Sequence, residues 1–156
     1  MSQTVRAFVG LGSNLGDRRA FLTAAVRDLP NKVAVSGVYK TAPIGGPAQG
    51  PFLNLVVEMR TSVGPYDLLA ICQQLEASAG RARTERWGPR TLDIDVLLYG
   101  EFELNDTELT IPHPRMNERA FVLYPLAELA PELVPPRWRE TVSDQEIVRV
   151  DDLLCC

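Results

Sequence analysis

The order in which hydrophobic periodicity changes along the chain constrains its fold more than any other feature. Segments that alternate, or that are rich in β-branched residues, lie at 5–12, 32–40, 52–60 and 91–99 and are typical of strands. Apolar residues at helical spacing lie between the first and second of these segments, and again between the third and fourth. This order is the split βαβ pattern, so we predict an α+β, ferredoxin-like fold. Such a fold has a mainly antiparallel sheet with helices packed on it.

Residues that start and stop helices mark the ends of the two predicted helices. Asp17 is suited to cap the first helix, which Pro30 would end. Gly64 and Pro65 open the second helix, with proline in its first turn, and Gly80 is suited to follow its end. These residues therefore agree with the periodicity about where both helices lie.

The rest of the chain extends this core without dividing it. A short hairpin is predicted after Gly100, followed by a loop and a helix within 112–131. Residues after Pro135 are ambiguous, and SDQEIVRVDDLL (143–154) could form either a helix or a strand with a tail. A chain of 156 residues has the size of one ordinary domain, so we expect residues 1–156 to form a single domain.

Charge and composition exclude several classes of protein. The formal net charge of −4 argues against a dedicated nucleic-acid binder. The N-terminus lacks the pattern of a signal peptide, and no apolar run approaches the roughly 20 residues of a membrane helix. The three cysteines and one histidine do not have zinc-site spacing, and Cys72 fits a helical core. We therefore expect a reduced, cytoplasmic protein that binds neither nucleic acid nor membrane.

Two carboxylates on one face of a predicted strand are the strongest local signal for chemistry. In the segment 91–99, Asp93 and Asp95 alternate with Leu92, Ile94 and Val96, and side chains at i and i+2 share a face. Carboxylates so close together repel unless a cation lies between them. Three explanations remain open: a bound divalent cation such as Mg²⁺, neutralisation by nearby arginines, or a solvated face.

An arginine cluster directly before that strand favours the first explanation. Residues 81–90 contain Arg81, Arg83, Arg86 and Arg90 but one acid. Guanidinium groups match phosphate oxygens in a bidentate manner. Arginines beside a paired-carboxylate metal site are the components of phosphoryl transfer. A magnesium-dependent phosphohydrolase or nuclease, and a non-catalytic nucleotide-binding module, remain as alternative functions.

Two weaker motifs permit both a structural and a functional interpretation. The segment 10–17, GLGSNLGD, has one residue too many for the dinucleotide-binding fingerprint, so a turn with a helix cap is favoured. Gly10 or Gly12 could still let a ligand approach the backbone closely. His113 lies between two prolines, near Arg119, where it could bind phosphate or be merely structural.

Four segments together resemble one enzyme family. They are LGSNLGDR (11–18), TAPIGGPAQGPFLN (41–54), GRARTERWGPRTLDIDVLLYG (80–100) and IPHPRMNERAFVLYPLAELAPEL (111–133). Their sequence and order resemble the 6-hydroxymethyl-7,8-dihydropterin pyrophosphokinases of folate biosynthesis. The resemblance implies a monomeric, ferredoxin-like enzyme with ATP as co-substrate. It would transfer pyrophosphate from ATP to the pterin's hydroxymethyl group and release AMP.

The resemblance also implies a role for individual residues. Asp93 and Asp95 match the family's pair that binds two Mg²⁺ ions. The residues that match a loop closing over the substrates are Arg81, Arg83, Arg90 and Trp87. Those that match the lining of the ATP site are Gln73, Glu76, Arg86, Thr110, His113 and Arg119. On the pterin side, Phe52 and Phe121 match aromatics that sandwich the ring, and Asn54 matches the amide that reads its edge. Thr41, Ala42 and Ile44 match positions that act mainly through backbone groups.

Overall fold

A six-stranded sheet organises the molecule, and every strand pair in it is antiparallel. The computed structural model describes residues 3–14, 16–42, 50–79 and 91–151. The strand order is β5–β1–β4–β3–β8, and β2 also pairs with β4. The strands are β1 (Val5–Ser13), β2 (Lys32–Val35), β3 (Val38–Thr41), β4 (Phe52–Thr61), β5 (Asp93–Tyr99) and β8 (Ile147–Asp151).

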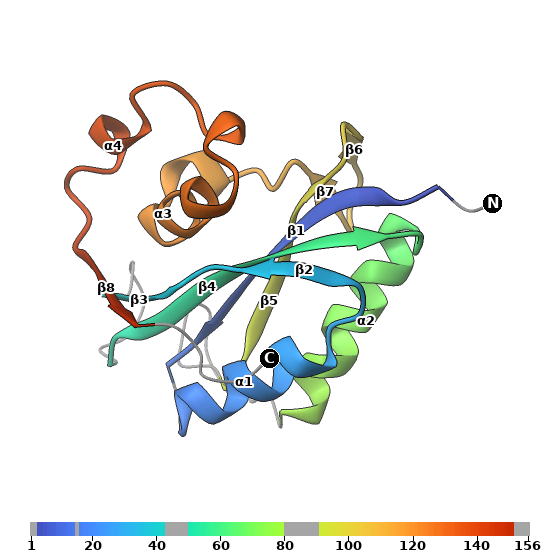
Figure 1. Cartoon of the computed structure of the whole chain (residues 1–156), viewed down its shortest axis with the longest axis horizontal. Coiled ribbons are helices and arrows are strands. Elements are labelled where there is room, and N and C mark those ends of the chain that lie inside the picture. The colour runs from blue at the N-terminus through green and yellow to red at the C-terminus, as the bar shows by residue number, and fades with distance from the viewer. Residues whose placement is uncertain (1–2, 15, 43–49, 80–90, 152–156) are drawn as a thin grey trace.

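Helices cover both faces of the sheet (Figure 1). On one face lie α1 (Arg18–Asp28) and α2 (Pro65–Ser78), whose Leu22 and Leu68 join the main core with Val9, Leu11 and Val57. On the other lie α3 (Ala120–Leu129) and α4 (Trp138–Thr141). A mainly antiparallel sheet with helices packed on it confirms the predicted fold class.

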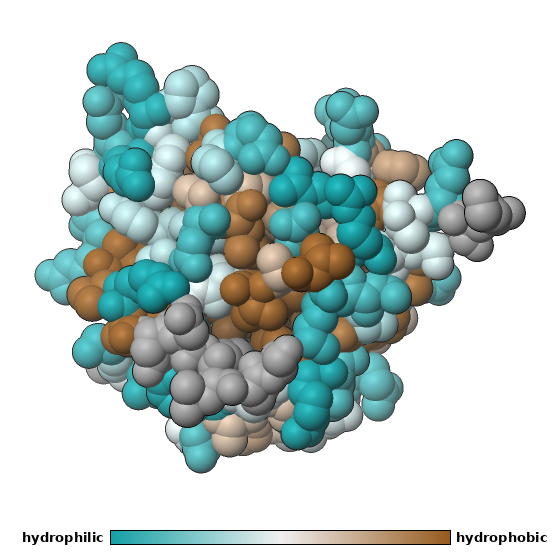
Figure 2. Space-filling view, viewed as in Figure 1, coloured by the Kyte–Doolittle hydropathy of each residue, from teal (hydrophilic) through white to brown (hydrophobic). Residues whose placement is uncertain are grey.

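Shorter elements complete the chain. The predicted hairpin after Gly100 is present as β6 (Leu104–Asn105) and β7 (Thr110–Ile111), and two 3₁₀ turns, η1 (Met116–Glu118) and η2 (Pro131–Leu133), flank α3. None of the described helices combines the length and the apolar character that crossing a bilayer requires. Figure 2 shows hydrophobic residues gathered near the middle of one face, with hydrophilic side chains around them.

The cap of α1 is confirmed, but the single strand predicted at 32–40 is wrong. Asp17 Oδ1 accepts a hydrogen bond from the Ala20 amide at 3.1 Å, as expected of an N-cap. The strand divides into β2 and β3 at Ser36. Ser36 contacts Val56 of β4 twice, because its amide donates to the Val56 carbonyl (2.9 Å) and its Oγ accepts from the Val56 amide (2.9 Å). The Ser36 hydroxyl thus replaces a backbone carbonyl as the acceptor for the Val56 amide, and the register of pairing with β4 shifts between β2 and β3.

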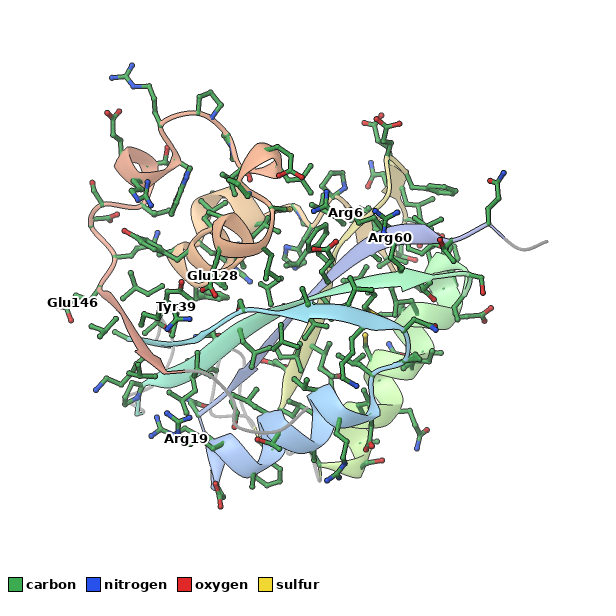
Figure 3. The ribbon with its side chains drawn as sticks, viewed as in Figure 1. Arg6, Arg19, Tyr39, Arg60, Glu128 and Glu146 are labelled. Carbon is green, nitrogen blue, oxygen red and sulfur yellow. The ribbon has the colours of Figure 1, made fainter. Side chains whose placement is uncertain are left out.

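Of the two alternatives for residues 143–154, the strand is observed, as β8, and the short helix α4 lies before that segment. Glu128 of α3 joins this addition to the sheet (Figure 3). Its carboxylate accepts hydrogen bonds from Tyr39 Oη (2.8 Å) and the Gly37 amide (3.0 Å), and forms an ion pair with Arg149 of β8 (3.3 Å). Burial raises the pKa of Tyr39 to about 12, with the Glu128 carboxylate contributing, so this phenol stays a donor at physiological pH.

Replacing Glu128 with alanine should therefore lower the free energy of unfolding by about 2 kcal/mol, because hydrogen bonds to a charged group are lost and the buried Tyr39 hydroxyl loses its acceptor. Urea unfolding measures the change. Glu140→Ala is the control, since its ion pair with Arg137 is exposed and should contribute less than about 1 kcal/mol. Equal losses in the two variants would contradict a special role for Glu128.

Candidate active site

One row of residues across three strands forms the centre of the candidate site. Gly12 in β1 lies opposite Asp93 of β5 on one side and opposite Asn54 of β4 on the other. Gly10 lies opposite Asp95 in the same way. Directly opposed residues in antiparallel strands project from the same face. Both carboxylates and the amide therefore project from one face of the sheet, with two glycines between them.

That face is the one that α3 covers only in part. Val56 and Leu97 of the sheet pack with Val122 and Leu126 of α3 in a second hydrophobic cluster. Two residues before Val56 in β4, the same face carries Asn54, and two residues before Leu97 in β5 it carries Asp95. The face therefore changes from apolar under the helix to polar beyond it.

The predicted alternation along β5 is observed. Ile94 and Val96 are buried in the main core with residues of α1 and α2, whereas Asp93 and Asp95 are half-buried on the opposite face. Cys72 of α2 is also in this core, as predicted. Burial raises the pKa of its thiol to about 12, with Glu76 and Asp95 adding to the effect, so the thiol stays protonated.

Asn54 is held by a second polar side chain. Its Nδ2 donates a hydrogen bond to Thr41 Oγ1 at 2.8 Å, and both residues are buried, at 4% and 5% exposure. The resemblance implied that Thr41 acts mainly through its backbone. In the structure its hydroxyl also orients the Asn54 amide, which keeps Oδ1 and one amide hydrogen for other partners.

Glu76 contacts the acidic strand from α2. Its Oε2 accepts a hydrogen bond from the Ile94 amide at 2.8 Å. Among the described strands, β5 pairs only with β1, so its outer edge offers backbone groups that no strand satisfies. Glu76 accepts from the edge amide of Ile94, which lies between Asp93 and Asp95 in the chain. This hydrogen bond holds the segment that carries both carboxylates. Gln73 lies one turn earlier on α2 and is exposed.

His113 and Arg119 approach the same face from beyond β5. The His113 amide donates to the Leu97 carbonyl at 3.0 Å, which fixes this segment against the strand. His113 Nδ1 accepts from the Arg115 amide at 3.2 Å, so a neutral ring carries its proton on Nε2. Burial lowers the pKa of His113, although the Asp95 carboxylate acts in the opposite direction. The Arg119 guanidinium lies 5.3 Å from the centre of the Phe121 ring.

The His113 environment can be checked by proton NMR, because the chain has a single histidine. In metal-free buffer its titration midpoint should lie below the ordinary value of 6.5. Asp95→Asn should lower the midpoint further, because a favourable carboxylate is removed, and Arg119→Gln should raise it. Because folding lowers the pKa of His113, this residue contributes stability above pH 6.5, where its ring is neutral in both folded and unfolded protein. That contribution is lost as the pH falls through the lowered pKa. A midpoint above 6.5 that neither variant moves would contradict this geometry.

Comparison with known proteins decides the family. A family model for 7,8-dihydro-6-hydroxymethylpterin-pyrophosphokinase (HPPK) matches residues 8–131. A 2-amino-4-hydroxy-6-hydroxymethyldihydropteridine pyrophosphokinase of Bacillus subtilis (strain 168) is 46% identical over 149 residues, which cover 92% of this chain and 89% of the relative. The chain belongs to the HPPK family. A protein of the same name from Pseudomonas aeruginosa is 48% identical over 139 residues, 86% of each chain.

Solved structures agree with the fold of the HPPK family. The crystal structure of "HPPK-DHPS in complex with substrates" aligns with a TM-score of 0.66 at 15% identity, covering 91% of this chain and 43% of that one. Wild-type Plasmodium falciparum HPPK-DHPS aligns with a TM-score of 0.65 at 16% identity, covering 91% and 41%. The chain thus spans about two fifths of those structures. The family match ends at residue 131, so α4 and β8 lie after it.

The remaining residues expected from the HPPK resemblance divide into three groups. Phe52 projects from the same face of β4 as Asn54, and Phe121 lies half-buried in the first turn of α3. Thr110 lies on the β6–β7 hairpin, where its hydroxyl donates to the Asp106 carbonyl (3.4 Å), and Ala42 is exposed just after β3. Six expected residues lie outside the described part of the chain: Ile44, Arg81, Arg83, Arg86, Trp87 and Arg90.

Asp93 and Asp95 suit a magnesium ion whose other ligands are water and the oxygens of a phosphate. Within the described ranges, no group of three or more His, Cys, Asp or Glu side chains could hold a metal by itself. Mg²⁺ usually takes one or two carboxylates and completes its octahedron with water and substrate phosphates. The donor set therefore suits Mg²⁺ with a polyphosphate.

Proposed function

We propose that this chain transfers the pyrophosphoryl group of ATP to 6-hydroxymethyl-7,8-dihydropterin, a step of folate biosynthesis. The hydroxymethyl oxygen would attack the β-phosphorus, and the bond from that phosphorus to the α–β bridging oxygen would break. The products would be AMP and the pterin pyrophosphate, with the hydroxyl proton passing to solvent. The observation that carries the proposal is the row Asp93–Gly12–Asn54. It puts a carboxylate that would bind the metal on the same face of the sheet as an amide that would pair with the ring.

Asp93 and Asp95 would hold Mg²⁺, and we propose two ions, as the resemblance implies. Bound there, the metal would neutralise the triphosphate and help align its β-phosphorus with the acceptor. Glu76 would keep the acidic strand in place through the Ile94 amide. The Nε2–H group of His113 and the guanidinium of Arg119 would donate hydrogen bonds to phosphate oxygens. Both side chains are close enough to Asp95 for its charge to act on their pKa values.

Binding of the pterin would use the other end of the same row. Phe52 and Phe121 would stack on the two faces of the flat ring, and the Asn54 amide would pair with its donor and acceptor edge. Catalysis would come mainly from alignment and charge neutralisation, because the transition state of phosphoryl transfer is loose and needs little help from a general base. We propose that the chain acts as a monomer in the cytoplasm and that residues 1–156 work as one domain.

One assay tests the proposal against the alternative functions. The purified chain is incubated with ATP and Mg²⁺, with and without the hydroxymethyl pterin, and nucleotides are separated by chromatography. AMP that appears only with pterin is the expected result. Phosphate release without pterin would indicate a phosphohydrolase, cleavage of added nucleic acid a nuclease, and ATP binding without AMP a non-catalytic module.

A further inference from the structure

The backbone conformation at Gly12 does not require a glycine. Among the described glycines, Gly16 and Gly100 have positive φ values, 71° and 53°, where other residues are strained. Gly12 lies instead within β1, in regular pairing with β4 and β5. An alanine could adopt this backbone, and a strand interior disfavours glycine by roughly 0.5–1 kcal/mol relative to alanine. The reason for glycine must therefore lie in its surroundings.

The space beside Gly12 is filled by Asn54. A Cβ at this position would lie 2.7 Å from Asn54 Oδ1, closer than real Cβ contacts, and 3.6 Å from Cδ1 of Phe52. The obstacle is the end of a side chain rather than backbone, so it could move without unfolding the strand. The movement would break the Nδ2 to Thr41 Oγ1 hydrogen bond, because the amide is held between Gly12 and Thr41.

We propose that Gly12 is a positioning residue for pterin recognition, acting through Asn54. The missing side chain lets the Asn54 amide lie over β1 with its remaining donor and acceptor available to the ring edge. This inference rests on the proposed function, in which Asn54 binds a flat heterocycle with adjacent donors and acceptors. Gly12 thereby contributes to selection of the pterin without touching it.

Gly12→Ala should raise the pterin KM about tenfold or more, because a paired amide contact is misdirected. The ATP KM should stay within about twofold, and circular dichroism should show that the fold is kept. Gly64→Ala is the control, since it makes the same substitution at the start of α2, outside the candidate site. A Cβ there would have one neighbour within 4 Å, Asp67 Oδ2 at 4.0 Å. The pterin KM of this control should change less than about twofold.

A double-substitution cycle separates positioning from a direct or structural effect. In an Asn54→Ala background the amide is gone, so Gly12→Ala should add almost nothing to the pterin KM. Calorimetric titration with the hydroxymethyl pterin on the same four proteins repeats the cycle at equilibrium. An unchanged pterin KM in Gly12→Ala, or an equal increase in the Asn54→Ala background, would overturn the inference.

The two levels of the hypothesis fail differently. If wild-type protein forms no AMP with pterin, the proposed function fails, and the calorimetric cycle still decides whether Gly12 acts through Asn54. Absence of pterin binding by wild-type protein would overturn both. Pterin-dependent AMP formation that Gly12→Ala leaves intact at low pterin concentration would overturn the role of Gly12 alone.

Discussion

Asp95→Asn should reduce pterin-dependent AMP formation about 10³-fold at saturating substrates. The substitution keeps the size of the side chain but removes the charge that would hold Mg²⁺ near the phosphates. The fold should persist, because Asp95 is half-buried on the polar part of its face while its neighbours Ile94 and Val96 keep their core contacts. Steady-state assays across a Mg²⁺ titration measure the effect, and circular dichroism checks the fold.

The matched control for Asp95→Asn is Glu103→Gln, which removes one negative charge at an exposed position near the β6–β7 hairpin. Its turnover should match that of wild type. Full activity of Asp95→Asn at ordinary Mg²⁺ concentration would remove the basis for a metal site on β5. If Glu103→Gln lost as much turnover as Asp95→Asn, the cause would be the net charge of the protein and not the position of Asp95.

Arg90→Ala should lower turnover by a similar factor, about 10³-fold, while the dissociation constant for pterin changes little. Arg90 lies outside the described residues, but it precedes Asp93 by only three positions in the sequence. A guanidinium so close in the chain to the acidic pair is expected to neutralise charge on the transferred group. Single-turnover measurements separate that step from substrate binding.

Arg60→Ala provides the comparison for Arg90→Ala, because Arg60 is exposed near the opposite end of β4 from Asn54 (Figure 3). It should leave both turnover and pterin binding as in wild type. If Arg90→Ala weakened pterin binding and left single-turnover chemistry intact, the assignment of Arg90 to the phosphate side would be wrong.

The sheet and its acidic face could be predicted because both depend on local patterns. Period-two alternation around Asp93 and Asp95 assigned a face to each carboxylate, and the burial of Ile94 and Val96 agrees. The cap at Asp17 is equally local, since its partner is the Ala20 amide. Such features require no knowledge of what packs against them.

Other features depend on contacts that no local pattern contains. Alternation runs through Ser36, yet the strand divides there because Ser36 Oγ takes the place of a backbone acceptor for Val56. The course of the C-terminal segment depends on Glu128 meeting Tyr39 and Arg149, which are 89 and 21 residues away in the chain.

The candidate site shows the same division. Family resemblance assigned Asn54 and Glu76 to substrates, but the hydrogen bonds that orient them, to Thr41 and to the Ile94 amide, required the packed structure. The proposed role of Gly12 could not be inferred from the sequence either, because a glycine in a sequence does not reveal which neighbour occupies its space. The glycine pattern at 10–17 had only suggested close approach of a ligand.

The row through Gly12 also sets a length. Adjacent strands lie ~4.8 Å apart, so the backbones of Asp93 and Asn54 are separated by about 10 Å, two strand spacings, with β1 between them. Substitutions can change the side chains at positions 93 and 54. The distance between the two backbones is maintained by the main-chain hydrogen bonds of β1 with β5 and β4. An enzyme built on this sheet to phosphorylate a much longer or shorter alcohol would have to change its loops and leave these three strands as they are.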